Sequence, residues 1–204
     1  KDLQLAFFKS GVPHIDVPQD HAFFATMYKF ASKYKIKTIL TGGNYSTECV
    51  RNPLEWMYYQ SDVIQLKDIH KKFGSRSLNT FPLIDVFTYK IIYKYFYGMQ
   101  VIKPLNYVNF NKNNAEELLN KRFSWEPFQH KHHESRFTRF YEDYWLPKKF
   151  GYDKRKAHFS SLIISNQMNR NIALERIKKS ELNEDFLMHE FKYIANKLEL
   201  TVDE

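Results

Sequence analysis

The segment that most constrains the fold is IKTILTGGNYSTE, residues 36–48. Its first five residues are mostly β-branched or apolar and lead into Thr41, Gly42 and Gly43, which is the pattern of a buried parallel strand that ends in a loop. Glycines carry no Cβ, so an anion or a substrate can approach their N–H groups closely. In open α/β sheets, ligands bind at this end of the strands. The pattern predicts a ligand-binding loop, with an ordinary tight turn as the alternative.

The residues before this strand favour an α/β fold. Apolar residues recur with helical spacing from Phe23 to Tyr34, which predicts a helix over residues 19–35. A helix, a strand and a glycine loop in succession make one unit of a doubly wound parallel sheet. We therefore predict an α/β part in residues 1–80, followed by a mostly α-helical region in residues 81–204.

The rest of the chain has mainly helical patterns. The predicted helices cover residues 2–9, 54–59, 66–73, 83–97 and 115–123, and several more lie between 134 and 200, the last at about 182–198. Residues 101–110 are predicted to be extended. Seven aromatic residues lie between Phe81 and Tyr97, and this density indicates that the helix there is buried or forms an interface.

Composition and charge limit the class of protein. The chain has 204 residues and a net charge of +8, which suits nucleic acid, polyphosphate or nucleotide-sugar partners alike. The single cysteine, Cys49, excludes an internal disulfide and a cysteine-cluster metal site. It also fits a reducing compartment, so we predict a cytoplasmic protein. No apolar run approaches the roughly 18 residues of a membrane span and no signal peptide is present, so no membrane partner is predicted.

A histidine cluster, His130 to His133 followed by Glu134, is conspicuous. Its spacing of three and four residues suits metal ligands on one helix face, but no second carboxylate motif lies nearby. We therefore predict no metal site and favour a solvated or anion-facing cluster.

Residues 134–155 combine cations with aromatic rings. Arg136 and Arg139 lie three positions apart and would share one face of a helix. Arginines can bind phosphate through two hydrogen bonds, and lysines add point charge. Two alternatives stay open: the rings pack inward while the charges are solvated, or the segment binds RNA by stacking bases on its rings.

Several long strings occur together and in order. They are GVPHIDVPQDHAFFATMY at 11–28, TGGNYSTECVRNPLEW at 41–56, DIHKKFG at 68–74, HKHHESRFTRFYEDYWLPKKFGYDKR at 130–155 and AHFSSLIISNQMNR at 157–170. Together they resemble the N-acetyl sugar amidotransferase family of surface-polysaccharide and nonulosonic-acid biosynthesis. The resemblance covers nearly the whole chain. It implies a PP-loop ATP pyrophosphatase with a Rossmann-like fold of the adenine nucleotide alpha hydrolase type.

The resemblance also implies a reaction. Such enzymes convert the acetamido group of a nucleotide-linked sugar to an acetamidino group, for lipopolysaccharide, O-antigen or flagellin glycans. ATP with Mg²⁺ would adenylate the amide oxygen, and ammonia would then displace AMP. The ammonia is expected from a partner pair that resembles the histidine-biosynthesis glutaminase and cyclase.

One departure from the family pattern matters. The Ser-Gly-Gly-x-Asp-Ser string of the PP-loop is absent, and the Gly-Gly pair at 42–43 is followed by Asn44. We therefore expect this chain to be the C-terminal part of such an enzyme, with the PP-loop upstream. Residues 1–80 would complete a nucleotide-binding domain, and residues 81–204 would form a substrate or partner domain. By itself the chain is not expected to hydrolyse ATP.

The resemblance places the active cleft at the glycine loop. Asn44 would orient the amide, and Glu48 would hold Mg²⁺ or accept a proton, unless it is a helix cap or a structural carboxylate. The predicted ATP-binding residues are Thr41, Gly42, Gly43, Ser46 and Arg51. Gln19 and Asp20 begin a helix that could face the same cleft. The predicted nucleotide-sugar residues are Lys131, Glu134, Arg136, Arg139, Lys148, Lys149, Lys154 and Arg155.

Two other classes of function stay open from the sequence. The first is a basic, helical RNA-binding or tRNA-modifying module of the same superfamily, although we expect no nucleic-acid partner. The second is a structural domain that docks the ammonia-supplying subunit, in which case the aromatic helix at 83–97 would form the interface.

Overall fold

The computed structural model describes residues 1–126, 128, 134–179 and 184–203. Contacts divide the chain into two units, Lys1–Thr41 with Pro53–Ile102, and Gly42–Asn52 with Lys103–Glu204. Each unit is described by itself. The boundary near residue 80 that the sequence indicates stays a prediction.

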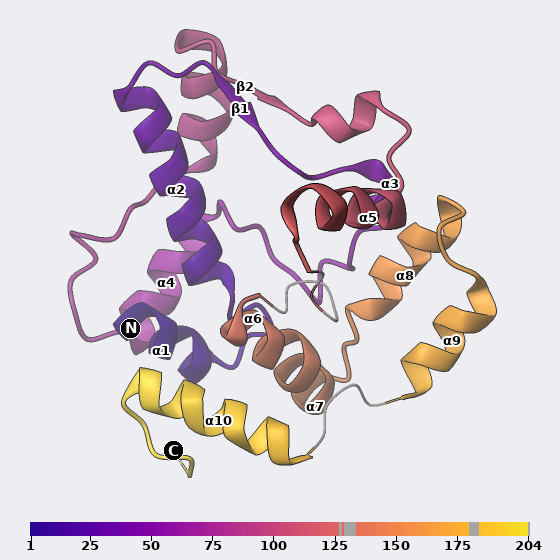
Figure 1. The fold of residues 1–204 in the computed structure, drawn as a ribbon. Helices are drawn as coiled ribbons and strands as arrows, with labels where there is room; N and C mark the ends of the chain where they lie inside the picture. Colours follow the sequence, from indigo (N-terminus) through magenta and orange to yellow (C-terminus); the bar gives the residue numbers. More distant parts are fainter. Residues whose placement is uncertain (127, 129–133, 180–183, 204) are drawn as a thin grey trace. The chain divides into compact units, whose positions relative to one another are not determined.

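The first unit contains helices α1, α2 and α4, the π-helix η1 and two short strands (Figure 1). Their bounds are Asp2–Ser10 for α1, Val17–Lys33 for α2, Thr38–Leu40 for β1, Val63–Phe73 for α4, Thr88–Phe96 for η1 and Gln100–Ile102 for β2. Local signals explain the ends of the helices. Gly11 takes a φ of 70° after α1, Pro18 lies in the first turn of α2, and Asp62 accepts hydrogen bonds from Ile64 and Gln65 at the start of α4.

Strands β1 and β2 pair in parallel, with Ile39 opposite Val101. This pairing confirms a parallel strand close to the predicted residues 36–40. The prediction that the strand is buried is wrong for most of its length, because Ile39 is buried while Thr38 and Leu40 are exposed. In the part of the chain that the structure describes, the sheet has only these two strands. Too little of it is covered for both faces to be buried, as a larger parallel sheet would be.

Two stacked tyrosines lie within one core cluster of the first unit. Tyr28 on α2 stacks on Tyr93 of η1, with ring centroids 5.8 Å apart. The buried cluster also contains Ala25, Ala31, Ile39, Ile84 and Met99. The small alanines on α2 leave space for the rings of η1, so the helix and the strand pack around stacked tyrosines.

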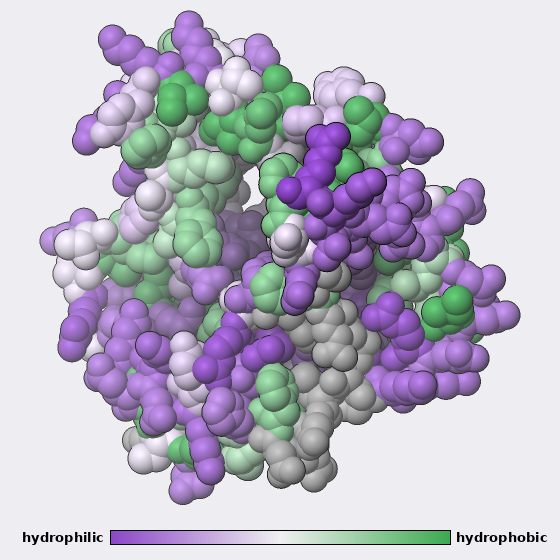
Figure 2. All heavy atoms as spheres, in the orientation of Figure 1, coloured by the Kyte–Doolittle hydropathy of each residue, from purple (hydrophilic) through white to green (hydrophobic). Residues whose placement is uncertain are grey.

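The predicted aromatic helix at 83–97 is present as residues 86–96, mostly in π-helical conformation. Its burial differs from the prediction, because Tyr93 is buried while Phe87, Tyr95 and Phe96 are more than 60% exposed. Figure 2 shows further hydrophobic residues, drawn in green, on the face of the molecule in view. Only one face of the helix packs on α2, and its role as an interface stays a prediction.

The predicted helix at 54–59 is wrong. Trp56 and Met57 both donate their backbone N–H groups to the carbonyl of Pro53, and no regular helix follows. The segment therefore forms an isolated turn. The predicted helices at 2–9, 19–35 and 66–73 are confirmed by α1, α2 and α4.

The second unit is helical. Its elements are α3 (Tyr45–Glu48), η2 (Pro104–Tyr107), α5 (Lys112–Phe123), α6 (Arg136–Phe140), η3 (Tyr141–Trp145), α7 (Leu146–Phe150), α8 (Arg155–Ile164), α9 (Arg170–Lys178) and α10 (Glu184–Leu198). The predicted helices at 115–123 and within 134–200 are thereby confirmed. The predicted helix at 182–198 is confirmed from residue 184, and residues 182 and 183 lie outside the described residues. The extended prediction for 101–110 holds only at its start, because η2 follows directly after Lys103.

Helices α6, η3 and α7 follow one another without a break, so residues 136–150 form one helical rod with a wider turn inside it. Pro147 explains the wide turn. Proline has no N–H to donate to the carbonyl of Asp143, and its ring would collide with that carbonyl in a regular α-helix. The backbone relaxes into the π-helical turn at 141–145, in which the Leu146 N–H reaches the Tyr141 carbonyl.

His21 is a fully buried polar side chain in the first unit. Its Nδ1 donates to the Gln60 carbonyl at 2.6 Å, and its Nε2 accepts the Ile84 N–H at 3.3 Å. Both contacts require the neutral ring, so His21 links α2 to two loops as an uncharged group. Neighbouring Asp20 accepts a hydrogen bond from the Gln60 amide and belongs to the same connection.

We predict that acidification weakens this unit. Burial lowers the pKa of His14 and of His21 below the ordinary value of 6.5. The unfolded chain then takes up protons first, so the contribution to stability is complete above pH 6.5 and is lost as the pH falls toward the folded-state pKa values. Urea unfolding at pH 7.5, 6.5 and 5.5 should show a decreasing free energy of unfolding, with a smaller decrease in His21→Gln. A constant free energy over this range would contradict the prediction.

Candidate functional site

The glycine loop lies in the second unit, and we call residues 42–48 the strand-tip loop. Asn44 organises it. The Asn44 Oδ1 accepts hydrogen bonds from the Thr47 N–H at 2.9 Å and the Thr47 hydroxyl at 3.2 Å, and its Nδ2 donates to the Gly42 carbonyl. Asn44 therefore caps the short helix α3 and is buried in doing so. The catalytic role predicted for Asn44 stays a prediction. A substrate would have to compete with these three internal hydrogen bonds for the Asn44 amide.

Other side chains hold the strand-tip loop from outside. Ser165, the C-cap residue of α8, donates to the carbonyl of Ser46 at 2.6 Å, and Asn106 on η2 accepts the N–H of Tyr45. Ser161, one turn before Ser165, accepts the N–H of Val50 just after α3. The loop is thus anchored through backbone atoms, which leaves side chains such as Glu48 at the surface.

The two glycines have different surroundings. Gly42 is exposed, and a Cβ added there would meet no atom within 4 Å. A Cβ added at Gly43 would lie 3.5 Å from both the Glu48 Oε2 and the Lys103 Nζ. A carboxylate and an ammonium group therefore converge beside a glycine with no side chain. Such a group of atoms can bind a phosphate oxygen, or a metal ion that a phosphate carries.

Lys103 is absent from the residues proposed from the sequence. It follows β2 directly, as Gly42 and Gly43 follow β1 after Thr41. Parallel pairing of β1 with β2 brings these two ends together, and the Thr41 N–H extends the ladder by donating to the Ile102 carbonyl. Lys103 could have been found by identifying β2 as the strand that pairs with β1. Local sequence patterns do not identify such pairs. Arg51, also proposed for ATP, is exposed beyond α3.

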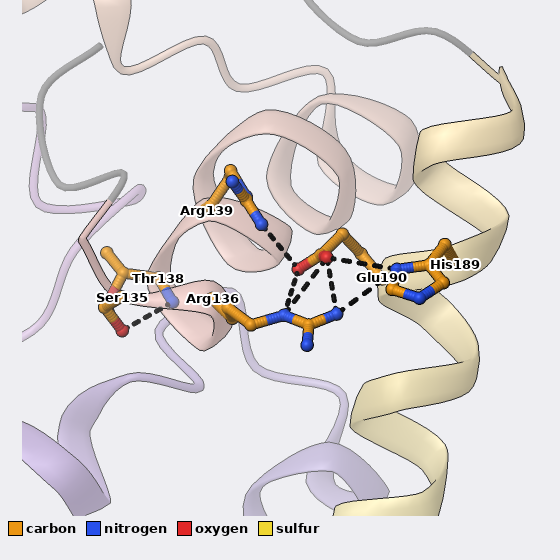
Figure 3. A network of polar contacts seen from close by, with 6 residues as sticks. All are labelled: Ser135, Arg136, Thr138, Arg139, His189 and Glu190. Atoms are coloured by element: carbon orange, nitrogen blue, oxygen red, sulfur yellow. Dashed lines mark hydrogen bonds and ion pairs between the residues drawn. The ribbon is translucent and has the colours of Figure 1, made fainter. Parts of the chain in front are cut away.

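The two arginines predicted to bind phosphate meet inside the second unit on a buried carboxylate. Glu190 of α10 accepts hydrogen bonds from the Arg136 Nε and Nη2 and forms an ion pair with the Arg139 Nη2 at 3.0 Å (Figure 3). The Glu190 side chain is 3% exposed. Burial alone would raise the pKa of Glu190, but the two arginines outweigh it and hold the pKa below its usual value.

Aromatic rings support this cluster. The Arg136 guanidinium lies 3.5 Å from the centroid of the Tyr193 ring, and the Arg139 guanidinium lies 4.5 Å from that of Phe186. Stacking on rings adds a cation–π contribution and restricts both side chains. The arginines therefore hold α10 against α6, and a diphosphate would have to compete with Glu190 for them.

The next two cations are also in internal ion pairs. Lys154 pairs with Glu142 at 2.7 Å, and both side chains are mostly buried. Arg155 binds Asp153 through two nitrogens and also donates to the carbonyls of residues 176, 177 and 179 at the end of α9. Arg155 thereby satisfies carbonyls that the end of a helix leaves without partners.

The remaining residues proposed to bind the nucleotide-sugar do not form one cluster in the described part of the chain. Lys149 lies over the Trp145 ring at 4.3 Å, Lys148 lines a cleft beside α10, and Glu134 is exposed. Lys131 lies outside the described residues, as do His130, His132 and His133. Within the described ranges, no group of three or more His, Cys, Asp or Glu side chains could hold a metal ion. In the same part of the chain, no helix is long and apolar enough to cross a membrane.

Comparison with known families gives one match. The model for the LPS biosynthesis protein WbpG-like, C-terminal domain matches residues 134–204, the last third of the chain. No curated protein matches the chain. No solved structure matches it either. The match supports, at a coarse level, a biosynthetic protein of lipopolysaccharide, and the matched residues contain the whole arginine cluster around Glu190.

We predict that Glu190→Gln strongly destabilises the protein. Removing one partner of a buried ion pair leaves charge without compensation and costs on the order of 3 kcal/mol in the free energy of unfolding. Glu116→Gln is the matched control, because the Glu116 pair with Lys112 is more exposed and should contribute less than about 1 kcal/mol. Chemical unfolding of both variants measures the difference. Equal losses would show that Glu190 has no special role in stability.

Proposed function

We propose that this chain is the C-terminal part of an ATP-dependent amidotransferase of lipopolysaccharide or related glycan biosynthesis. The observation that carries the proposal is the family match over residues 134–204. The resemblance of the strings along the rest of the chain supports the finer assignment. The substrate would be a nucleotide-linked sugar whose acetamido group becomes an acetamidino group.

The reaction has two balanced steps. The amide oxygen of the sugar attacks the α-phosphorus of ATP, and the bond to the β-phosphate breaks, so that pyrophosphate leaves. Ammonia then attacks the activated carbon, the carbon–oxygen bond breaks, AMP leaves and the nitrogen loses a proton. Mg²⁺ would neutralise phosphate charge during the first step.

The strand-tip loop suits this chemistry. Gly42 is exposed and carries no Cβ, so a phosphate can approach its backbone closely, and the Lys103 ammonium adds positive charge beside Gly43. The Glu48 carboxylate, at the same distance from the Gly43 position, can hold Mg²⁺ or accept the proton that ammonia loses. In this proposal Asn44 positions the loop by its cap.

The nucleic-acid alternative has no specific support from the geometry. It would use the same cations, and Arg136, Arg139, Lys154 and Arg155 all form ion pairs with carboxylates of the second unit. Charge that is paired inside the fold is less available to a phosphate backbone.

The direct test uses the full-length protein from its native reading frame. It is incubated with ATP, Mg²⁺, ammonium ions and a UDP-linked N-acetyl sugar. We expect AMP and pyrophosphate in equal amounts, and a sugar product whose mass shows the replacement of oxygen by NH. If the sugar stays unchanged while ammonia, ATP and a range of UDP-N-acetyl sugars are supplied, the proposed function is wrong.

We further predict that Lys103→Ala and Glu48→Gln reduce turnover by about 100-fold or more, because each removes an electrostatic contact with the reacting groups. Their melting temperatures should stay close to that of the wild type. Lys112→Ala is the matched control, since it removes a cation from an exposed pair in the same unit. Steady-state release of pyrophosphate measures all three variants. Turnover of Lys103→Ala equal to that of Lys112→Ala would remove Lys103 from the site.

A further inference from the structure

A cleft of about 490 Å³ lies between the η3–α7 part of the helical rod and α10. Its lining residues are Asp143, Tyr144, Pro147, Lys148, Leu187, Met188 and Phe191. The volume falls within the range of roughly 300–1,000 Å³ that small-molecule sites usually have. We call this cavity the α10 cleft. It belongs to the region of the family match and is separate from the strand-tip loop residues.

Two aromatic rings form a fixed wall of the α10 cleft. Tyr144 and Phe191 meet edge to face, with centroids 5.7 Å apart and an interplanar angle of 87°. Behind them, the buried ring of Phe140 packs on both, at 5.5 Å from Tyr144 and 5.6 Å from Phe191. A wall held from behind in this way loses little side-chain entropy when a flat ligand binds to it.

The backbone also explains why the cleft is there. Pro147 forces the π-helical turn at 141–145, and the residues of that turn and the next, from Asp143 to Lys148, supply one side of the cleft. Single π-helical turns inside helices are frequent at functional sites, since they redirect side chains. The other side is held in place by Glu190, because this residue ties α10 to α6 between Met188 and Phe191.

The charges at the α10 cleft distinguish Lys148 from the cations around it. Arg136, Arg139, Lys154 and Arg155 are paired with carboxylates of their own unit. Lys148 is exposed, lines the cleft and makes no ion pair within the described part of the chain. Asp143 contributes a carboxylate to the same lining, so a ligand here meets a donor cation, an acceptor and a ring wall together.

We propose that the α10 cleft binds a nucleoside diphosphate. The base would lie against Tyr144 and Phe191, the Lys148 ammonium would bind a phosphate oxygen, and Asp143 would accept hydrogen bonds from ribose hydroxyls. An anion alone would not need the apolar wall, and an apolar ligand alone would not need the charges. The identification as a substrate site rests on the proposed function, in which both substrates carry such a group.

Binding of four probes to the 204-residue chain tests the proposal by isothermal titration calorimetry. The probes are UDP, ADP, uridine and pyrophosphate. We expect one equivalent of UDP or ADP to bind saturably, and more tightly than either uridine or pyrophosphate. The nucleotide that binds more tightly identifies whether the sugar substrate or ATP is the source. Absence of saturable nucleotide binding, or pyrophosphate binding as tight as the better nucleotide, would overturn the proposal.

Three variants locate the binding. Lys148→Ala should weaken nucleotide binding by about tenfold or more, because a charge-assisted hydrogen bond is lost. Met188→Trp should abolish binding by filling the cleft. Because Met188 is 50% exposed, a larger side chain at this position should not disturb the fold. Lys192→Ala is the matched control, since it removes an exposed cation from the same helix outside the lining, and it should stay within about twofold of the wild type.

These results separate the cleft from the proposed reaction. If Lys148→Ala and Met188→Trp both bind nucleotide as tightly as the wild type, the nucleotide does not bind in the α10 cleft. This conclusion holds even if the full-length enzyme makes the amidino sugar. Binding that both variants impair supports the cleft, even if the amidino product never forms. Melting curves recorded for each variant show that a loss of binding is not a loss of fold.

Discussion

The second unit depends on one buried carboxylate. Glu190 lies on α10, while the arginines that neutralise it lie on α6, more than fifty residues earlier in the chain. A buried carboxylate without these partners would be unfavourable by several kcal/mol in real proteins, so α10 can pack here only with the arginines in place. The packing of α10 in turn brings Leu187, Met188 and Phe191 to the side of the cleft. The ion pairs at Glu190 therefore help to hold the α10 side of the cleft in place, together with the packing of Phe191 on Phe140 and Tyr144.

The ion pairs of Glu190 also change how the basic segment at 134–155 is interpreted. A net charge of +8 and a row of cations indicate an anion partner when only the sequence is considered. The fold pairs much of that charge with its own acids, and Arg136 and Arg155 act mainly as connections between helices. Asp153 lies two residues before Arg155, but the carboxylates that pair with Arg136, Arg139 and Lys154 lie on other elements, at distances that local patterns do not cover. Lys148 is distinguished from Arg136, Arg139, Lys154 and Arg155 only after the carboxylate partners of these four cations are known.

The sequence predicted what local physics controls. Helical spacing gave α1 and α2 within a few residues, because the pattern acts over one or two turns. The start of α2 was placed two residues too late, since Pro18 belongs to the first turn of the helix in the structure. The strand at 38–40 was also predictable, but its partner at 100–102 was not, since pairing is a long-range contact. Lys103 was missed for that reason. Asn44 was predicted to be catalytic, and its role as the N-cap of α3 was missed. The sequence does not show where so short a helix begins.

If the proposed function is right, the enzyme must tell two polyphosphate substrates apart. The strand-tip loop and the α10 cleft differ in the features that such a distinction requires. Near the loop the groups are backbone N–H, Lys103 and Glu48, which respond to phosphate charge and metal but offer little surface to a base. In the cleft a ring wall accompanies Lys148, so charge and flat apolar surface are recognised together. A ligand without a base loses the ring contacts, while its charge still suits the loop. Specificity would then come from the difference between the two sites, since phosphate affinity alone favours neither substrate.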